Sequence, residues 1–481
     1  MDDDVPLYLQ IVERLTRLVE VGSLKRGDRI PSVREMAQQQ GVATSTVLQA
    51  YRQLEDRGLV EARPRSGYFV ARPPPRLAVP ETTRPPRDSL AVDVNSLVQT
   101  VMAAAVDPSC VSFGAACPSG ELFQLDRVRI ALSRATQRQP GALGRYPFAP
   151  GSDALRQAIA RRALAMGCQL DYRQLLITNG CLESISLCLR AVTQPGDVVA
   201  LESPTYFGFL QILQSLGLRA LEIPTKPRTG MSLEALELAL DTQPVKAVLA
   251  VPTLSNPLGA TLPTADKRRL AALLEQRGIP LIEDALLNDL YGGDDRRRAV
   301  KSFDRSGNVM LCGSFSKTVA PGIRLGWVEA GRWTDTVMLQ KAVLSGGHTE
   351  LLELAMADLL SQPGYEPSLR RLRERLEQRL DRGRRLVAAS FPRETRITDP
   401  GAGYILWVEL PEALDALALF RACLAERICI APGRMFTATQ RYGHCIRLGV
   451  GGAWGEAQEQ ALGRIGRLAG DLLRRGLPRA A

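Results

Sequence analysis

The stretch CGSFSKTVAPGIRLGW, residues 312–327, contains one lysine, Lys317, in a setting where surface lysines are uncommon. The apolar run at residues 308–312 predicts a buried strand that leads directly into the serines around this lysine. Small residues follow, together with a single arginine, Arg324. A lysine at the end of a buried strand, with a serine on each side, is a candidate for chemistry rather than for solvation.

Strands and helices alternate from about residue 95 onward. Short apolar runs predict the strands, and amphipathic runs between them predict the helices. This alternation is typical of an α/β domain with a mostly parallel sheet, in which ligands bind beyond the C-terminal ends of the strands. The predicted strands are residues 174–180, 197–204, 246–252, 279–285 and 308–312, and the predicted helices are residues 181–192, 207–217 and 265–278.

The residues at these predicted strand ends together suit one cofactor, pyridoxal phosphate (PLP). The cofactor needs a lysine for a Schiff base, a carboxylate at its pyridinium nitrogen and an aromatic partner for its ring. Its phosphate needs backbone N–H groups, hydroxyls and an arginine. Each residue alone has a structural explanation, such as a helix cap or a core position, but the ordered set indicates a PLP site. The set is Asn179, Gly180, Tyr206, Asn256, Asp284, Ser314, Ser316, Lys317 and Arg324.

The N-terminal segment has a different pattern. Residues 7–21 carry apolar positions at three- and four-residue spacing and predict a helix. Ser32 and Glu35 have the spacing of a capping box at the start of a second helix, which Gly41 ends. A third helix is expected over residues 44–57. Two helices joined by a tight glycine turn predict a helix-turn-helix.

A predicted wing follows this helix-turn-helix. Residues 59–63 and 68–72 read as short strands around a turn with a basic tip. Small polar residues begin the third helix, where they can approach base edges and phosphates. These features and the arginines favour DNA binding over the alternative, a small helical cap domain. The arginines are Arg34, Arg63 and Arg65.

Residues 5–71 resemble the winged-helix domain of the GntR family of bacterial regulators. The resemblance rests on DRIPSVREMA, the turn GVATSTV, the helix end YRQLEDRGLV and the wing RPRSGYFV. It implies contacts with double-stranded operator DNA from Arg34, Thr44, Ser45, Thr46, Arg63, Arg65 and Gly67.

Net charge does not establish DNA binding by itself. The chain of 481 residues has a formal net charge of +10, but basic and acidic residues are about equal in number over residues 1–71. The densest basic run, residues 369–385, alternates with leucines at helical spacing and predicts a solvated amphipathic helix.

Residues 72–94 are rich in proline and predict a linker of polyproline character. At about 3 Å per residue such a linker reaches about 60 Å. It would separate a DNA-binding domain, residues 1–71, from a PLP-binding domain, residues 95–481. Within the latter we expect a large part at about residues 140–335 and a smaller α/β part formed by residues 95–139 and 336–481.

The composition points to a cytoplasmic protein without a metal site. Nine scattered cysteines suggest free thiols in a reducing compartment. No apolar run is long enough to span a bilayer, and the acidic start MDDDVP lacks a secretory signal. The two histidines, His348 and His444, argue against a histidine metal site or a Ser-His-Asp triad.

Residues 95–470 resemble the class I aminotransferases of fold type I. The matching motifs are RYPFAPGSDALRQAIA (145–160), ITNG (177–180), ESPTYFG (202–208), SNPLG (255–259), IED (282–284), SFSKTVAPGIRLGW (314–327) and CIRLG (445–449). The resemblance implies that Lys317 forms the Schiff base, Asp284 pairs with the pyridine nitrogen, Tyr206 stacks on the ring and Asn256 bonds its phenolic oxygen. The implied phosphate ligands are Gly180, Cys181, Ser314, Ser316 and Arg324.

The same resemblance implies a dimer and a ligand. Tyr146 corresponds to a tyrosine that reaches the phosphate from the neighbouring subunit. Arg447 corresponds to the arginine that binds the α-carboxylate of an amino acid.

A GntR winged helix joined to such a domain resembles the MocR subfamily of transcriptional regulators. This resemblance implies a head-to-tail homodimer that binds an operator and senses PLP or an amino-acid-like effector. The alternatives are an active aminotransferase that carries a DNA-binding domain, and a structural or interaction protein with an inactive site. Leu286 and Leu287 stand where aminotransferases usually have a tyrosine after Asp284, which argues against fast turnover. Ala116 replaces a glycine that is usual in the substrate loop.

Overall fold

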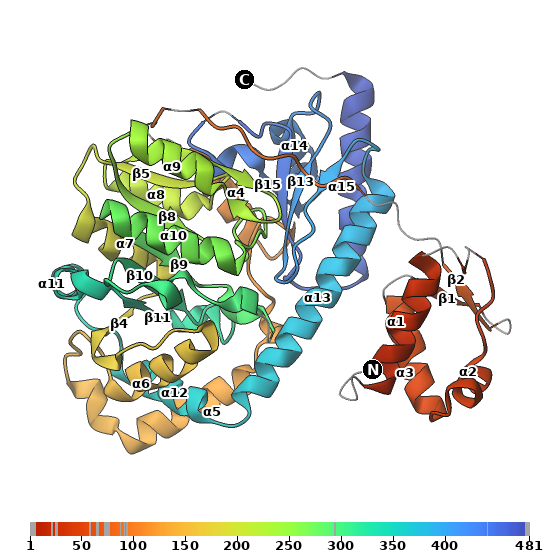
Figure 1. The fold of residues 1–481 in the computed structure, drawn as a ribbon, viewed down its shortest axis with the longest axis horizontal. Coiled ribbons are helices and arrows are strands. Elements are labelled where there is room, and N and C mark those ends of the chain that lie inside the picture. The colour runs from red at the N-terminus through yellow and green to blue at the C-terminus, as the bar shows by residue number, and fades with distance from the viewer. Residues whose placement is uncertain are drawn as a thin grey trace. The chain divides into compact units, whose positions relative to one another are not determined.

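The computed structural model describes residues 6–20, 23–24, 27–56, 59–63, 67–71, 77–86, 88–90, 92, 95–292, 295–439 and 441–476. The chain divides into an N-terminal unit, Met1–Leu77 with Arg385–Ala389, and a larger C-terminal unit, Ala78–Arg384 with Ser390–Ala481 (Figure 1).

The N-terminal unit has the predicted order of three helices and a hairpin. Ser32 accepts a hydrogen bond from the backbone N–H of Glu35, whose carboxylate accepts one from the N–H of Ser32, so the predicted capping box is confirmed. Gly41 ends the helix in the left-handed region, with φ of 64°. The elements are α1 (Leu7–Glu20), α2 (Val33–Gln40), α3 (Thr44–Asp56), β1 (Val60–Arg63) and β2 (Gly67–Val70).

A small core joins the helices of this unit to the hairpin. Tyr51 of α3 is fully buried, and its hydroxyl donates to the carbonyl of Pro31 at 2.7 Å. Its ring meets Tyr68 of β2 edge to face, with centroids 4.8 Å apart. The predicted end of the third helix at residues 57–58 and the wing tip at residues 64–66 lie outside the described residues.

The C-terminal unit is built on an eight-stranded sheet that is mostly parallel, as predicted. The strands β11 and β7 run antiparallel to their neighbours. In spatial order the strands are β4 (Leu175–Thr178), β11 (Gly326–Glu329), β10 (Val309–Ser314), β9 (Leu281–Asp284), β8 (Val245–Ala250), β5 (Val198–Ser203), β6 (Arg219–Lys226) and β7 (Gly230–Met231).

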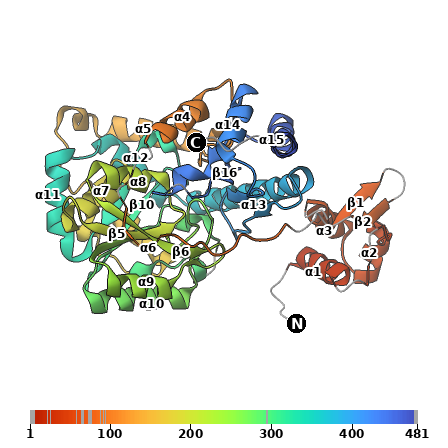
Figure 2. The same cartoon turned by 90° about the horizontal axis from the view of Figure 1, so that it is seen from above.

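Helices cover both faces of this sheet. Figure 2 shows α9 (Leu233–Thr242) and α10 (Thr264–Arg277) on one face, and α7 (Cys181–Val192) and α8 (Phe207–Ser215) on the other. The side chains of α9 and α10 pack with β5, β6, β8 and β9 into a buried apolar core. Because both faces are covered, the strands are nearly continuous apolar runs, which is why the sequence predicts them well.

A second, smaller sheet lies in the same unit. It has four strands in the order β12 (Arg396–Ile397), β13 (Ile405–Glu409), β16 (Cys445–Gly449) and β15 (Ala431–Pro432). Beside it, β3 (Val111–Ser112) pairs with β14 (Ile428–Cys429). The helices that accompany these strands are α4 (Asn95–Val106), α13 (Tyr365–Ser390), α14 (Ala416–Ala425) and α15 (Glu456–Arg475).

The predicted amphipathic helix at residues 369–385 is confirmed as part of α13. Its leucines, which include Leu369, Leu372 and Leu376, are buried. The remaining helices are α5 (Leu125–Arg138), α6 (Asp153–Ala163), α11 (Thr334–Leu344) and α12 (Glu350–Ser361). The predicted division into a large and a smaller part stays a prediction, although α11 packs on α7 and α12 packs on α6.

The second half of the proline-rich segment is docked on the C-terminal unit. The hydroxyl of Thr83 donates to the carbonyl of Ser203 at 2.6 Å, and the N–H of Thr225 donates to that hydroxyl at 2.8 Å. Leu90 forms a β-bridge with Ala220 of β6. This part of the predicted linker is therefore packed on the C-terminal unit, because its threonine and backbone groups satisfy polar groups at the ends of β5 and β6.

Candidate cofactor site

A cavity of about 260 Å³ lies beyond the C-terminal ends of β5, β8, β9 and β10. Its walls bring together residues that are far apart in the sequence, as expected where parallel strands end at one sheet edge. The predicted site residues that line it are Cys181, Tyr206, Asn256, Asp284, Ser314, Ser316, Lys317, Arg324 and Arg447.

Lys317 lies just beyond β10 with its side chain in the cavity wall. Its Nζ donates to the carbonyl of Ala116 at 2.9 Å. Burial lowers the pKa of Lys317 below its ordinary value, and the nearby charges of Arg447 and Arg324 act in the same direction. A lower pKa increases the neutral, nucleophilic fraction of the amine, which carbonyl chemistry requires.

Asp284 ends β9 and is buried. Its Oδ1 accepts hydrogen bonds from the N–H of Leu286 at 2.8 Å and from the thiol of Cys181 at 3.4 Å. Burial raises the pKa of Asp284 to about 6. A buried carboxylate of this kind stabilises a proton on a neighbouring ring nitrogen, because the resulting cation compensates its charge.

An anion-binding corner lies at the start of α7. Gly180 precedes this helix with φ of 97°, and no side chain caps the first turn. A Cβ on Gly180 would lie 2.8 Å from Nη2 of Arg324, so only glycine allows this approach. Ser314 and Ser316 complete the corner, with their hydroxyls 2.9 Å apart. Helix N–H groups, hydroxyls and a guanidinium together suit a phosphate.

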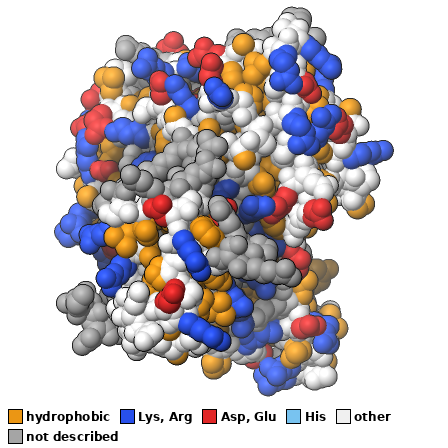
Figure 3. Space-filling model, turned by 90° about the vertical axis from the view of Figure 1, so that its right-hand side faces the viewer, with side chains coloured by type: hydrophobic (Ala, Val, Ile, Leu, Met, Phe, Trp, Pro, Cys, Tyr) orange, Lys and Arg blue, Asp and Glu red, His pale blue; other side chains and the backbone are white. Residues whose placement is uncertain are grey.

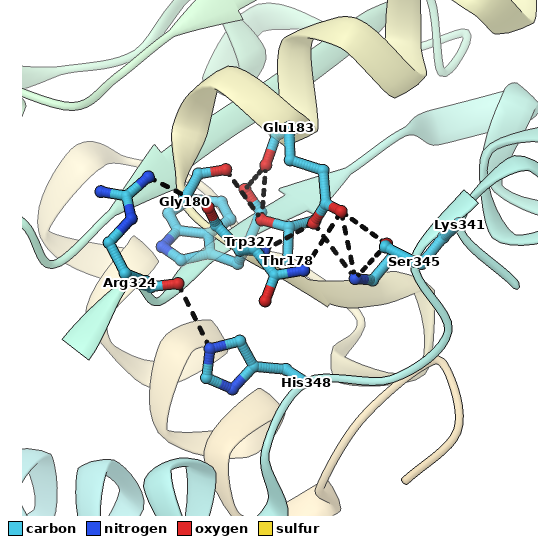
Figure 4. A network of polar contacts seen from close by, with 10 residues as sticks. Thr178, Gly180, Glu183, Arg324, Trp327, Lys341, Ser345 and His348 are labelled. Carbon is cyan, nitrogen blue, oxygen red and sulfur yellow. Dashed lines mark hydrogen bonds and ion pairs between the residues drawn. The ribbon is translucent and has the colours of Figure 1, made fainter.

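Figure 4 shows the polar network that supports this corner. Arg324 donates from Nη2 to the carbonyl of Asn179 at 3.2 Å. Glu183 accepts from the N–H of Asn179 at 2.5 Å and from the buried amine of Lys341 at 3.1 Å. His348 approaches the carbonyl of Arg324 with Nε2 at 3.2 Å. These supports could not be predicted from the sequence, because no local pattern relates Glu183 to Lys341.

Arg447 is fully buried in the middle of β16. Its Nη2 donates to the carbonyl of Gly114, and its Nη1 lies 3.5 Å from Oδ1 of Asn256. Nε has no hydrogen-bond partner, and no ion pair joins Arg447 to an acidic residue of the described chain. Burial lowers the pKa of Arg447 to about 10, so the group stays cationic at neutral pH. A buried cation without a counter-ion is costly unless an anion joins it.

The aromatic wall of the cavity is Tyr206. Its ring packs against Phe207 and Phe209, with centroids 4.6 and 5.4 Å away. A Cβ on Gly208 would lie 2.5 Å from this ring, so the glycine allows the ring its position. Taken together, the amine, the carboxylate, the anion-binding corner and the unpartnered Arg447 Nε fit PLP with an amino acid beside it.

The structure does not bring every candidate into the cavity. Tyr146 is 89% exposed and is absent from the cavity wall. Leu286 and Leu287 line the cavity where a tyrosine is usual, and Tyr291 is buried elsewhere. Tyr404, which the sequence analysis missed, lines the cavity and donates its hydroxyl to the carbonyl of Ala116 at 3.3 Å. It precedes β13, and no strand-end motif marks it.

The candidate DNA contacts lie on the helix-turn-helix and the wing. Arg34, Thr44 and Ser45 are exposed, and Thr46 is half-buried. The side chain of Arg63, and Arg65 as a whole, lie outside the described residues. In Figure 3, Lys and Arg side chains are interspersed with Asp and Glu over the face of the molecule that it displays.

Gly67 opens β2 in the left-handed region, with φ of 100°. A Cβ at this position would lie 3.5 Å from Nε of Arg29, an exposed arginine that the sequence analysis did not single out.

The described residues show neither a metal-binding cluster nor a membrane-spanning helix. They contain no group of three or more His, Cys, Asp or Glu side chains that could hold a metal ion. Within the same residues, no helix is long and apolar enough to cross a membrane. All nine cysteines are free thiols.

Two parts of the chain match known protein families. Residues 110–465 match the family "Aminotransferase class I and II", and residues 7–70 match "Bacterial regulatory proteins, gntR family". The uncharacterized HTH-type transcriptional regulator YdcR of Escherichia coli is 39% identical over 96% of this chain and 98% of its own. The probable rhizopine catabolism regulatory protein MocR of Rhizobium meliloti is 28% identical over 90% of this chain and 87% of its own.

Solved structures resemble the C-terminal unit. LysN, the α-aminoadipate aminotransferase of Thermus thermophilus, complexed with N-(5'-phosphopyridoxyl)-L-leucine, has a TM-score of 0.73 at 26% identity. The match covers 78% of this chain and 95% of LysN. The fold-type I architecture and the resemblance to MocR are thus confirmed. The chain belongs to the family of GntR-type transcriptional regulators in which a helix-turn-helix domain is joined to a domain of aminotransferase class I and II.

Proposed function

We propose that this regulator, a cytoplasmic protein, holds PLP in the cavity and changes its affinity for operator DNA when an amino-acid-like effector binds beside the cofactor. The observation that carries the proposal is Arg447, a buried guanidinium with an unsatisfied Nε and no acidic partner among the described residues. It shares one cavity with Lys317 and Asp284. LysN, whose solved complex contains a phosphopyridoxyl amino acid, supports this reading by its similarity.

Each cavity residue has one proposed task toward the cofactor. When bound, PLP supplies an aldehyde that joins reversibly to a primary amine. Asp284 holds a proton at the pyridine nitrogen, Asn256 donates to the ring oxygen, and Tyr206 packs on the ring. Lys317 provides the amine, and its lowered pKa suits that role. The phosphate is held by Gly180, Cys181, Ser314, Ser316 and Arg324.

The effector would bind through its two charged ends. Its carboxylate pairs with Arg447, which then gains the partner that Nε lacks. Its amine takes the place of the Lys317 amine. The effector can shift the regulator only by the difference between its affinities for the two states of the protein.

The docked linker offers a route from the cavity to the DNA-binding unit. Thr83 bonds Ser203, which lies three residues before Tyr206. The hydroxyl of Ser203 also lies 2.8 Å from that of Tyr442. We expect a movement at the end of β5, next to Tyr206, to reach Thr83 and so the segment that leads to the winged helix.

An active aminotransferase is the second candidate. The retained cavity residues favour it, and so does 28% identity to the 2-aminoadipate transaminase of Thermus thermophilus. Leu286 and Leu287 favour sensing instead, since neither can donate a hydrogen bond to the ring oxygen. If the wild type rapidly transaminates a common amino acid, the protein is an active aminotransferase rather than a sensor.

A homodimer is part of the proposal. Exposed apolar side chains lie on two segments that meet where the N–H of Gly347 donates to the carbonyl of Pro147. Monomeric proteins seldom expose a large contiguous apolar patch, so this surface fits a second copy of the chain. In a head-to-tail pair, Tyr146 would reach the phosphate of the partner. The exposed residues are Leu143, Tyr146, Phe148, Leu339, Val343 and Leu344.

The first prediction concerns this dimer. Val343 is 75% exposed, and Val343→Lys places a charge in the proposed interface. Sedimentation should show dimer association weakened by about tenfold or more, since a buried unpaired charge is costly. Leu238→Lys, at an exposed position on α9, should leave the dimer intact. A wild-type protein that is monomeric at micromolar concentration contradicts the proposed dimer.

The second prediction concerns DNA. Arg34→Ala in the full chain should reduce the log–log slope of operator affinity against salt by about one per binding unit, because one phosphate contact is lost. Fluorescence anisotropy at several salt concentrations measures this slope. Arg17→Ala, an exposed position on α1, is the matched control. An unchanged slope for Arg34→Ala would remove that residue from the DNA contacts.

The experiment that tests the proposed function is an absorption spectrum of the purified protein with amino acids added in turn. We expect a visible band from the cofactor linked to Lys317, and a change of that band with at least one amino acid. A protein that shows no such band after incubation with PLP would defeat the proposal.

A further inference from the structure

We infer that the effector is an amino acid with an uncharged, apolar side chain, and that the site discriminates against acidic amino acids. The inference rests on the proposed function, because it takes Arg447 and the cofactor as the anchors of the ligand. It adds the chemical class of the effector's side chain.

The charges on the cavity wall leave no partner for a second carboxylate. Among the described residues that line the cavity, the cations are Lys317, Arg324 and Arg447, and the acid is Asp284. Arg324 is held at the phosphate corner by its bond to Asn179. Lys317 is committed to the cofactor, so Arg447 remains for the α-carboxylate of the effector.

The segment at residues 114–117 lies between these two anchors. Its carbonyl at Gly114 accepts from Arg447, and its carbonyl at Ala116 accepts from Lys317. A Cβ on Gly114 would lie 2.5 Å from Sγ of Cys429, so the position of the segment depends on this glycine. An effector that spans the two anchors must therefore lie against Ala115 and Ala116, which offer methyl groups.

The rest of the nearby wall is also apolar. Met102 of α4, Leu287 and Ile405 line the cavity. The hydroxyl of Tyr404 already donates to Ala116. Each methylene buried here would improve affinity by about fourfold. A side-chain carboxylate would lose its water without gaining a cation, which is costly.

The loop that would approach the partner's cavity in the proposed dimer offers aromatic side chains and a paired arginine. The exposed loop that would approach the partner's cavity carries the aromatic side chains of Tyr146 and Phe148. Arg145, between Leu143 and Tyr146, is paired with Glu350 at 2.9 Å.

The test compares two amino acids that carry a methyl group on the α-carbon, α-methylleucine and α-methylglutamate. Neither has an α-hydrogen to lose, so binding is measured without transamination. Calorimetric titration of the full-length protein loaded with PLP should show the leucine analogue bound at least about tenfold more tightly. Equal or tighter binding of the glutamate analogue overturns the inference and leaves the proposed function standing. If neither analogue binds to a protein that shows the cofactor band, the inference and the proposed function are both wrong.

A pair of variants sharpens the test. Met102→Arg adds a cation to the apolar wall and should shift the preference toward α-methylglutamate by about tenfold or more. Met102→Gln has similar length without charge and should leave the order of preference unchanged. The cofactor band of each variant reports that the cavity has formed. An unchanged preference in a Met102→Arg protein that retains the band counts against the inference.

Discussion

The Lys317→Ala variant is expected to lose completely the visible absorption band of the Schiff base between the cofactor and the lysine, while the protein stays folded. The side chain lies at the cavity wall, and its removal takes away the amine to which the aldehyde would be joined. PLP can still be held through the phosphate corner, so dialysis should release it faster from the variant than from the wild type. Absorption spectroscopy measures the band, and circular dichroism reports the fold.

Lys246→Ala is the matched control, because Lys246 is exposed near the N-terminal end of β8 and does not line the cavity. This variant should keep the full band. A Lys317→Ala protein that retains a reducible covalent link to PLP would show that another amine carries the cofactor, and the assignment of Lys317 would be wrong.

The Arg447→Gln variant is expected to keep the cofactor band and to bind amino acids about 100-fold more weakly, or not at all. Loss of one partner of a buried charge pair commonly has effects of this size. Glutamine keeps much of the side-chain length at this fully buried position, so the cavity should still form. Calorimetric titration gives the affinity, and DNA binding by this variant should no longer respond to amino acids.

Arg447→Lys separates charge from geometry. Lysine keeps the positive charge but cannot make two parallel bonds to a carboxylate, so an intermediate affinity is expected. A normal amino-acid response in Arg447→Gln would show that the carboxylate binds elsewhere. If the wild type responds to PLP and to no amino acid, the cofactor itself is the signal.

Local patterns explain which features the sequence could predict. The capping box at Ser32 and Glu35 and the glycine stop at Gly41 depend on residues within one turn of each other. The strands β5, β8, β9 and β10 are buried on both faces and read as apolar runs. Because the carboxyl ends of parallel strands lie at one edge of the sheet, the sequence alone predicts that the residues after these strands form a single site.

Long-range polar contacts explain what the sequence did not predict. Glu183, Lys341 and Ser345 meet through hydrogen bonds that no spacing rule indicates. The docking of Thr83 likewise depends on strand ends that are distant in the sequence. A proline-rich composition predicts that a segment has an extended backbone. It does not predict which surface the other residues of the segment pack against.

Coupling between the cavity and the winged helix can be measured by reciprocal titration. The affinity of the PLP-loaded protein for its operator is measured by anisotropy with and without a saturating amino acid. The affinity for that amino acid is then measured by calorimetry with and without the operator. Linkage requires the two factors to be equal, and coupling of the usual size predicts factors of about 5 to 150. If the amino acid leaves the operator affinity unchanged and the operator leaves the amino-acid affinity unchanged, the cavity and the winged helix are not coupled.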